Sequence, residues 1–405
     1  MNEHSRYIAG VDIGTTTVRS IVASLDSHNQ PTIVGISQYE NTGMKKGIIS
    51  HLEGPAKAVD ESLIELENIS GYQIGRASFS INGSHLLSNK VEGMIALASS
   101  ENRVLESDIE RLREVSTIGK IPANRETIDF IPYSYILDGQ GGISNPLDMS
   151  GSRLEVRANV VSSMIPHQSN IEQIADLADL EVNRIIPSVM AAGRAVLTEK
   201  QRESGVAVID LGATTTGIAI YEDGDLQYLR VIPIGGVNIT NDLAICLKIT
   251  PEIAEEIKLR HAIAGNREQD EDIMVKKGRE HYSFNTSEID EIIQARLEEI
   301  FEEVRKEFKR AGFDKQLPSG VVLVGGGANM KNIAEYSKSM LELASQVGEI
   351  HLESTVSDEF KKPEYAAAVG LMLEDMRDLP TENRRERAEV SGFGGIFAKI
   401  FGKKR

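Results

Sequence analysis

The chain has 405 residues, a length that suggests two or more domains, each large enough to bury a hydrophobic core. It carries 44 Lys and Arg against 61 Asp and Glu, and the net charge of -17 argues against a body that binds nucleic acid by neutralising phosphates. The single cysteine, Cys246, excludes an internal disulfide, and its apolar helical surroundings predict that it is buried. We see no secretory signal and no apolar run long enough to span a membrane.

The first half of the chain begins with a strand–turn–strand pattern. Residues 7–23 (YIAGVDIGTTTVRSIVA) place apolar and β-branched residues on both sides of a glycine and three threonines. Apolar residues at three- and four-residue spacing predict helices over 51–69 and 167–182. Residues 84–162 mix short strands, one helix near 106–116 and turns rich in Pro and Gly, which indicates a separate module inserted into the first lobe.

The second half repeats this layout. Residues 205–226 (GVAVIDLGATTTGIAIYEDGDL) match the first segment almost residue for residue, 198 residues further along, which suggests two lobes of similar fold. Residues 265–281 predict an exposed hairpin, and 287–312 predict a long helix that is rich in charge pairs and ends at Gly312. Residues 319–340 predict a buried strand, a glycine turn and a helix.

Both strand–turn–strand segments end their first strand in an aspartate followed two residues later by a glycine: Asp12 with Gly14, and Asp210 with Gly212. The glycine lets the backbone turn tightly beside a ligand, and the threonines that follow offer N–H and hydroxyl donors to phosphate oxygens. Two such hairpins facing each other would hold a triphosphate, while the aspartates held Mg²⁺ through its waters. The third turn, Gly325–Gly327, lacks side chains, so a base or ribose could lie against its backbone.

Competing motifs fail on inspection. No GxxxxGK[ST] occurs, and GGGANM has Met330 where GxGxxG needs its last glycine. The eight histidines show no HxxH or HExxH spacing, so we do not expect a histidine-based metal site.

The three turns together resemble those of the actin-like ATPase superfamily. The resemblance implies an α/β fold in which two RNase-H-like lobes close over ATP. It makes Asp12–Thr17 and Asp210–Thr216 the phosphate loops and Gly325–Gly327 the adenosine loop, with Glu255 and Lys258 reaching the ribose and base. The implied ATP and Mg²⁺ site consists of Asp12, Gly14, Thr15, Thr16, Thr17, Asp210, Gly212, Ala213, Thr214, Thr215, Gly235, Gly236, Glu255, Lys258, Gly325, Gly326, Gly327 and Asn329.

Within that superfamily the chain resembles the bacterial cell-division family FtsA along nearly its full length, in segments such as 43–53 and 232–244 and in the inserted module. One departure is Asp148, where relatives often have glycine. The resemblance implies this division: first-lobe core 1–83 and 163–203, subdomain IC 84–162, second-lobe core 204–240 and 315–360, subdomain IIB 241–314, a return helix 361–378, a linker 379–391, and an amphipathic membrane helix 392–405.

The C-terminal segment 392–405 (GFGGIFAKIFGKKR) is both apolar and basic. On a helix, its five large apolar side chains fall within about 140° of arc, with lysines beside them. Their burial would give roughly 8–15 kcal/mol before the cost of ordering, which is a reversible anchor for one copy and a firm one for an oligomer. A disordered end, or docking onto the protein's own core, is the alternative. The expected contacts with anionic lipid are Phe393, Ile396, Phe397, Lys399, Ile400, Phe401, Lys403 and Lys404.

The resemblance further implies an adaptor. DnaK-type chaperones supply a catalytic glutamate at the position of Ser188, so we expect weak or no ATPase activity here. The chain would self-assemble at the cytoplasmic face of the membrane, at the division septum. There it would tether FtsZ through 241–314, with Arg296 as a candidate contact, and recruit later division proteins through 84–162. Arg296 could instead simply pair with Glu299. A small-molecule kinase, a chaperone-type ATPase and a pilus-assembly ATPase are the alternatives.

Overall fold

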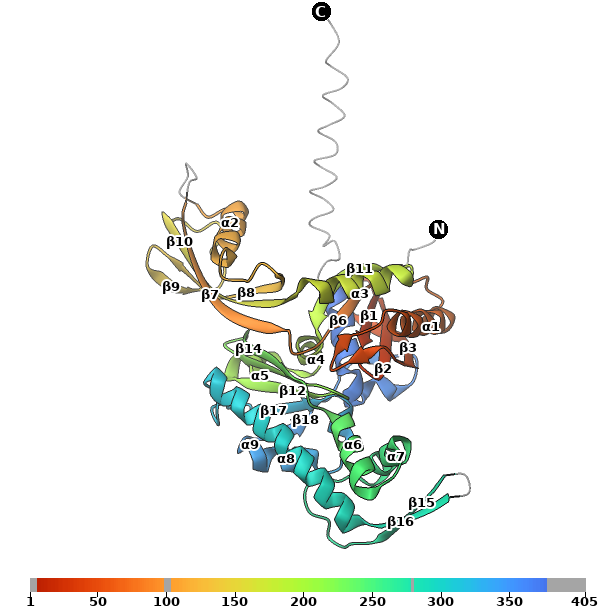
Figure 1. The fold of residues 1–405 in the computed structure, drawn as a ribbon. Helices are drawn as coiled ribbons and strands as arrows, with labels where there is room; N and C mark the ends of the chain where they lie inside the picture. The colour runs from red at the N-terminus through yellow and green to blue at the C-terminus, as the bar shows by residue number, and fades with distance from the viewer. Residues whose placement is uncertain (1–5, 98–102, 278–279, 377–405) are drawn as a thin grey trace, which may run out of the picture.

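The computed structural model describes residues 6–97, 103–277 and 280–376. Figure 1 shows two α/β lobes and a smaller inserted module that projects from the first of them.

The first lobe surrounds a six-stranded mixed sheet. Its central strand, β1, pairs antiparallel with β2 and parallel with β6. Helices α1 (Glu53–Ser70) and α3 (Ile165–Leu177) pack against one another and the sheet, while α10 (Ala366–Asp375) packs on the strands together with α4 (Ser188–Val196). In spatial order the strands are β11 (Glu181–Pro187), β6 (Arg76–Ile81), β1 (Tyr7–Ile13), β2 (Thr17–Leu25), β3 (Pro31–Glu40) and β19 (Glu353–Ser354).

The inserted module leaves the first lobe after β6 and returns to it at α3; we call it the insert. It is an antiparallel four-stranded sheet with α2 (Glu106–Thr117) packed on it. Apolar side chains such as Leu112 of α2 and Val156 of the sheet form a core of its own. The strands, in spatial order, are β7 (Leu87–Ala96), β10 (Arg153–Met164), β8 (Arg125–Leu137) and β9 (Gln140–Ile143).

The second lobe repeats the plan of the first around a five-stranded sheet. β12 pairs antiparallel with β13 and parallel with β17, so it occupies the place that β1 has in the first lobe. The sheet strands are β14 (Asp225–Ile232), β13 (Thr216–Glu222), β12 (Val206–Leu211), β17 (Val321–Val324) and β18 (Ser345–Val347). The remaining elements of this lobe are α6 (Gly236–Leu247), α7 (Pro251–His261), the hairpin of β15 (Asp272–Lys277) and β16 (Glu280–Asn285), α8 (Thr286–Ala311), the 3₁₀ helix η1 (Gly326–Asn329) and α9 (Ile333–Leu341).

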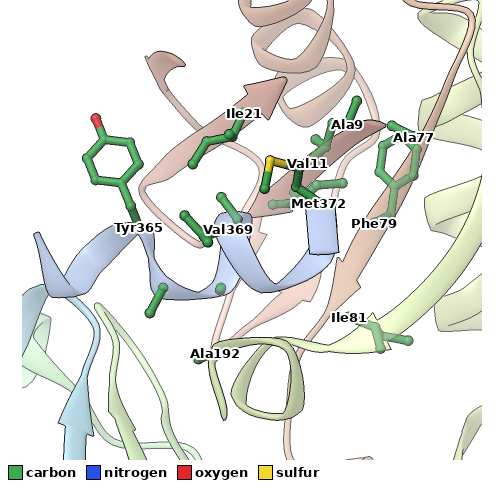
Figure 2. Close-up of a cluster of buried hydrophobic side chains, with 14 of the residues drawn as sticks. Ala9, Val11, Ile21, Ala77, Phe79, Ile81, Ala192, Tyr365, Val369 and Met372 are labelled. Atoms are coloured by element: carbon green, nitrogen blue, oxygen red, sulfur yellow. The ribbon is translucent and has the colours of Figure 1, made fainter. Parts of the chain in front are cut away.

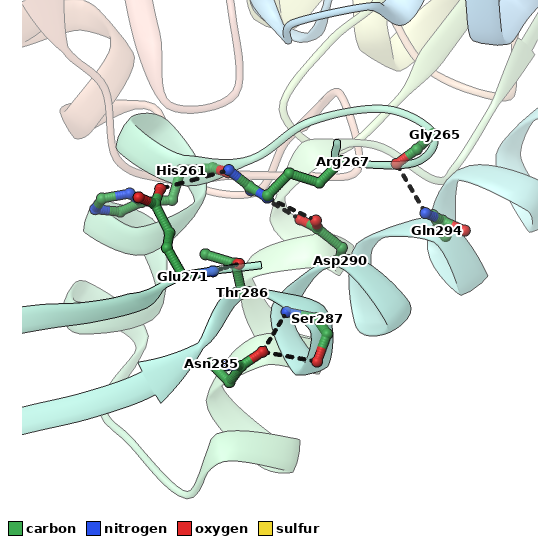
Figure 3. A network of polar contacts seen from close by, with 9 residues as sticks. All are labelled: His261, Gly265, Arg267, Glu271, Asn285, Thr286, Ser287, Asp290 and Gln294. Carbon is green, nitrogen blue, oxygen red and sulfur yellow. Dashed lines mark hydrogen bonds and ion pairs between the residues drawn. The ribbon is translucent and has the colours of Figure 1, made fainter. Parts of the chain in front are cut away.

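A polar network joins α7, the hairpin and α8 (Figure 3). The guanidinium of Arg267 donates to both carboxylate oxygens of Asp290, at 2.8 and 3.0 Å, and to the carbonyl of His261 at 2.7 Å. The Asn285 side chain caps α8 by accepting from the Ser287 N–H at 3.0 Å. The helix therefore begins at a defined residue, as N-capping predicts.

Helix α10 is held against the first lobe by close packing. Val369 and Met372 lie among the apolar side chains of the first-lobe sheet (Figure 2). Two glycines allow the approach: a Cβ on Gly10 would lie 2.4 Å from the carbonyl oxygen of Ala368, and one on Gly370 would lie 1.7 Å from that of Ala191. A larger residue at either place would force the helix away.

The end of α10 is fixed by a buried carboxylate. Asp375 is fully buried and accepts hydrogen bonds from the Ala9 N–H at 3.3 Å, the Ser78 hydroxyl at 3.0 Å and the Asn183 amide at 2.6 Å. These donors belong to β1, β6 and β11. The helix therefore ends at one defined place on the sheet, because a buried carboxylate that lost these donors would be left without partners.

The remaining short elements connect these units. They are β4 (Met44–Lys45), β5 (Ile48–Ile49), α5 (Glu199–Ser204), η2 (Asp358–Lys361) and η3 (Pro363–Tyr365). Within the described residues, no helix combines the length and apolar composition needed to cross a bilayer.

The expected two-lobed α/β architecture and the inserted module are confirmed, with local corrections. The helix expected over 167–182 ends at Leu177, because Asp179 turns the chain with φ of 52° and a strand follows. The hairpin expected over 265–281 lies further along, at β15 and β16. Cys246 is exposed rather than buried, since α6 buries Ile239 and Leu243 on another face. The expected linker and membrane helix lie outside the described residues.

Candidate functional site

The two lobes face each other across a cavity of about 470 Å³. Every residue expected at the nucleotide site lines it except Thr214. The hydroxyl of Thr214 is instead hydrogen-bonded to that of Thr15 at 2.8 Å, which joins the first turn of one lobe to the first turn of the other. The sequence repeat therefore brings its two turns together in space.

The first turn is closed by its glycine. The Gly14 N–H donates to the Thr17 carbonyl at 3.1 Å, and a Cβ on Gly14 would lie 2.6 Å from that oxygen. The Asn41 amide donates to the Gly14 carbonyl at 2.7 Å, and the Ile13 N–H to the Ser80 hydroxyl at 2.8 Å. The turn is thereby held from β1, β6 and the end of β3, with Thr15, Thr16 and Thr17 lining the cavity.

The second turn lies against the start of α6. The Gly212 N–H donates to the Thr215 carbonyl at 2.9 Å, while the Gly236 and Val237 N–H groups donate to the turn's own carbonyls at 3.0 and 2.7 Å. A Cβ on Gly235 would lie 2.6 Å from the Gly212 carbonyl. The glycines thus let the N-terminus of α6 approach the turn at the cavity, and helix N-termini favour anions.

Two carboxylates lie at the base of the cavity. Burial raises the pKa of Asp12, against the opposing effects of the Ser80 hydrogen bond and the Arg19 charge. Burial, and then the negative charge of Asp12, raises the pKa of Asp210 to about 7. A pair of carboxylates that repel each other in this way suits a hydrated divalent cation, which would favour the ionised form of both.

Another part of the cavity lining combines a charge pair with glycine backbone. The Lys258 ammonium donates to the Glu255 carboxylate at 2.7 Å, the Thr240 hydroxyl at 2.9 Å and the Gly236 carbonyl at 3.2 Å. Gly326 has open space where a side chain would stand. This part of the lining offers both hydrogen-bonding groups and a flat surface, as a nucleoside requires.

Several residues that line the cavity were not predicted from the sequence, among them Arg19, Gln38, Asn82 and Glu364. Gln38 accepts from Arg19 at 3.1 Å and from the Tyr365 hydroxyl at 3.2 Å, so the guanidinium is held in place. Strand alternation could have indicated Arg19, because it lies two residues after Thr17 on β2 and faces the same side. Ser188, also in the lining, stands at the start of α4.

Arg296 lies on α8 and outside the cavity lining. Its guanidinium donates to the Asp242 carboxylate at 2.6 and 2.9 Å and also to Glu299. The pairing with Glu299 that the spacing suggested is present, together with a second carboxylate from α6. The residues expected to bind lipid, from Phe393 onward, lie outside the described residues.

Solved structures share this architecture. The chain is similar to the PilM–PilN type IV pilus biogenesis complex, with a TM-score of 0.67, 17% identity and coverage of 91% of this chain and 98% of that chain. It is also similar to MreB5 of Spiroplasma citri bound to ADP, with a TM-score of 0.54, 12% identity and coverage of 95% and 98%. It is similar as well to the MamK double helical filament, with a TM-score of 0.51, 12% identity and coverage of 93% of this chain and 100% of that chain. The two-lobed architecture and its cleft are those of an actin-like fold.

Sequence comparison identifies the family. The chain belongs to the FtsA family of cell-division proteins: the model for cell division protein FtsA matches residues 207–370, and that for the SHS2 domain inserted in FtsA matches 83–162. FtsA of Pseudomonas aeruginosa is 32% identical over 375 residues, covering 92% of this chain and 89% of that protein. FtsA of Neisseria meningitidis serogroup B is 29% identical over 408 residues, covering 99% and 98%.

Proposed function

We propose that the chain binds ATP with Mg²⁺ between its lobes and, in that state, self-assembles on the cytoplasmic face of the membrane. There it would tether FtsZ filaments at the division septum. The observation that carries the proposal is the pairing of two similar turns across the cavity, joined by Thr15 and Thr214. Membership of a cell-division family supports the setting.

Each part of the cavity would have its own role. The turn N–H groups and threonine hydroxyls would hold phosphate oxygens, and Arg19 would add the positive charge that the acidic cavity floor lacks. Asp12 and Asp210 fit a hydrated Mg²⁺, which would offset their charge and that of the phosphates. Glu255 and Lys258 would bind the ribose and base beside the glycines of η1.

We propose slow or negligible hydrolysis. By the resemblance to DnaK-type chaperones, a water-orienting glutamate would stand where this chain has Ser188, which lines the cavity, and a hydroxyl is a poor general base. Apart from the aspartates of the two turns, the carboxylates that line the cavity are already hydrogen-bonded. Glu255 accepts from Lys258, and Glu364 accepts from the Asn329 amide at 2.7 Å. ATP would serve mainly to favour closed lobes through its differential affinity for that state. A turnover above about 1 s⁻¹, the low end for ordinary enzymes, would contradict this.

Lipid contact would come from residues 392–405, whose apolar stripe and lysines suit an anionic surface. Self-assembly would multiply these weak anchors. The similarity to a filament, the MamK structure, supports self-association, and the insert would carry contacts to later division proteins.

FtsZ would bind the second lobe on the side of α6 and α8, with Arg296 as the candidate contact. Arg296 is engaged already, so an acidic partner would displace Glu299, whose side chain is 49% exposed, rather than the more buried Asp242. Arg296→Ala and Asp242→Ala distinguish the roles in co-sedimentation with FtsZ. Loss of binding in Arg296→Ala alone supports a direct contact, and equal loss in both indicates a structural pair.

Calorimetry on the full chain tests nucleotide binding. We expect uptake of ATP that depends on Mg²⁺, and a weakening of about tenfold or more in Asp12→Ala. Asp60→Ala, on the exposed side of α1, is the control and should bind as the wild type does. Absence of Mg²⁺-dependent uptake by the folded wild type would refute the site.

Vesicle flotation tests the tether. The full chain should float with anionic vesicles and carry FtsZ with it, whereas a chain ending at Val390 should remain in the soluble fraction. Neutral vesicles separate the contribution of the lysines from that of the apolar stripe. Flotation of the shortened chain at the level of the full one would refute the anchor.

A further inference from the structure

The insert belongs to the first lobe by connectivity, yet it is hydrogen-bonded to the second. The Ser88 hydroxyl on β7 accepts from the Leu229 N–H at 2.8 Å and lies 3.3 Å from the Leu229 carbonyl, to which it donates. The Asn159 amide on β10 donates to the Leu226 carbonyl at 2.9 Å. Both leucines lie on β14, the edge strand of the second-lobe sheet. Two insert strands therefore satisfy backbone groups that an edge strand would otherwise leave unpaired.

The Asn159 contact is buried, and the Ser88 contacts are part-buried. Asn159 is 1% exposed, and Leu226 and Leu229 are 2% and 1% exposed. The leucines share one hydrophobic core with Val161 of the insert and with the first-lobe sheet. Breaking the hydrogen bonds here would leave polar groups without water or partners, which is costly in such surroundings.

The segment that leads into the insert touches the cavity. Asn82, the first residue after β6, donates from its side-chain amide to the Thr215 hydroxyl at 3.2 Å, and both line the cavity. Three residues later the His85 carbonyl accepts from the Arg125 guanidinium at 2.5 Å, and the same group donates to the Ser162 carbonyl at 2.7 Å. The segment between β6 and β7 is thus hydrogen-bonded to the second-lobe turn through Asn82 and to β8 of the insert through His85.

We propose that the insert is a clasp between the two lobes and that its position is coupled to nucleotide in the cavity. The inference rests on the proposed ATP site. Because the insert is attached to the first lobe at both ends, separation of the lobes would pull β14 away from Ser88 and Asn159 while also pulling Thr215 from Asn82. A nucleotide that bridges the lobes stabilises the clasped arrangement. By linkage, a partner that binds the insert and moves it changes the affinity for nucleotide by the factor by which nucleotide changes the affinity for that partner.

Pulsed electron paramagnetic resonance on the full chain tests the clasp. Cys246 is the single cysteine and is exposed on α6, so it takes one spin label on the second lobe. Glu114→Cys on the exposed side of α2 supplies the other, on the insert. We expect ATP with Mg²⁺ to narrow the distance distribution. Ser88→Ala combined with Asn159→Ala should broaden the distribution of distances between the two labels. It should also weaken nucleotide binding by about fivefold or more, which is the low end of the coupling usual between two sites.

Ser134→Ala is the matched control, since Ser134 is a half-buried insert serine whose hydroxyl has no hydrogen-bond partner among the described residues. It should behave as the wild type does. Ser88→Ala alone provides the test if the double variant does not fold. Nucleotide binding with unchanged affinity and unchanged distances in the clasp variants overturns the inference and leaves the proposed ATP site standing. Absence of nucleotide binding in the unlabelled wild type overturns the ATP site, and the coupling with it.

Discussion

Asp210→Asn should stabilise the nucleotide-free protein, and more so at higher pH. The pKa of Asp210 is raised from 3.8 to about 7, first by burial and then by the charge of Asp12. The folded protein therefore keeps this proton at pH values where the unfolded chain has lost it. The contribution of Asp210 to the free energy of unfolding is fully present below about pH 4 and is lost as the pH rises through about 7. An amide at this position has no proton to lose, and its contribution does not vary with pH.

The size of the effect follows from the pKa difference. At about 1.36 kcal/mol per pKa unit, a shift from 3.8 to about 7 corresponds to a penalty of about 4 kcal/mol once Asp210 is ionised in both states. At pH 5 only the unfolded chain has lost the proton, and the penalty is about 2 kcal/mol. The advantage of the amide should therefore grow by about 2 kcal/mol between pH 5 and pH 8.

Urea unfolding of wild type and Asp210→Asn at pH 5 and pH 8, without nucleotide or Mg²⁺, measures this difference. Asp60→Asn removes the same charge from the exposed side of α1 and serves as the control. The same Asp210→Asn protein should lose the stabilisation that ATP with Mg²⁺ gives the wild type. A gain of equal size at both pH values, or a loss at pH 8, would refute the reasoning, because either would show that packing rather than ionisation governs the site.

Three further predictions follow from other parts of the molecule. Burial, and then His167, lowers the pKa of His85 to about 4, so the free energy of unfolding should fall as the pH drops from about 6.5 to 4. His85→Gln should remove about 3 kcal/mol of that loss in urea unfolding. An unchanged loss of stability in acid would contradict this. Gly370→Ala should lower the free energy of unfolding by about 1–3 kcal/mol in calorimetry, because its methyl would lie 1.7 Å from the Ala191 carbonyl. Lys258→Met should weaken ATP binding about tenfold in titration calorimetry, and unchanged affinity would exclude a nucleoside contact.

The sequence predicted the parts of the fold that depend on local pattern and repetition. Asp12 and Asp210 stand in matching turns, and two turns of the same kind in two similar lobes could be expected to face each other. The structure brings them together, with Thr214 directed to Thr15 instead of the cavity. That detail depends on the distance between the lobes, which no local pattern contains.

Features that depend on packing between distant segments could not be predicted. Ser88 and Asn159 are ordinary polar residues in strands, and only the position of the insert shows that they face β14. Cys246 was expected to be buried because its neighbours are apolar, yet the buried face of α6 was set by the neighbouring helices. Asp148 adopts φ of 64°, which explains why glycine would suit this position.

The anchoring of Asp375 has a mechanical consequence. Traction applied to the chain beyond α10 is passed through Asp375 to β1, β6 and β11, and β1 is the strand that carries Asp12, whereas the second lobe has no part in these three bonds. A copy held at a surface by its end would therefore bear the load on its first lobe, and the second lobe would receive it only through the insert and the paired turns.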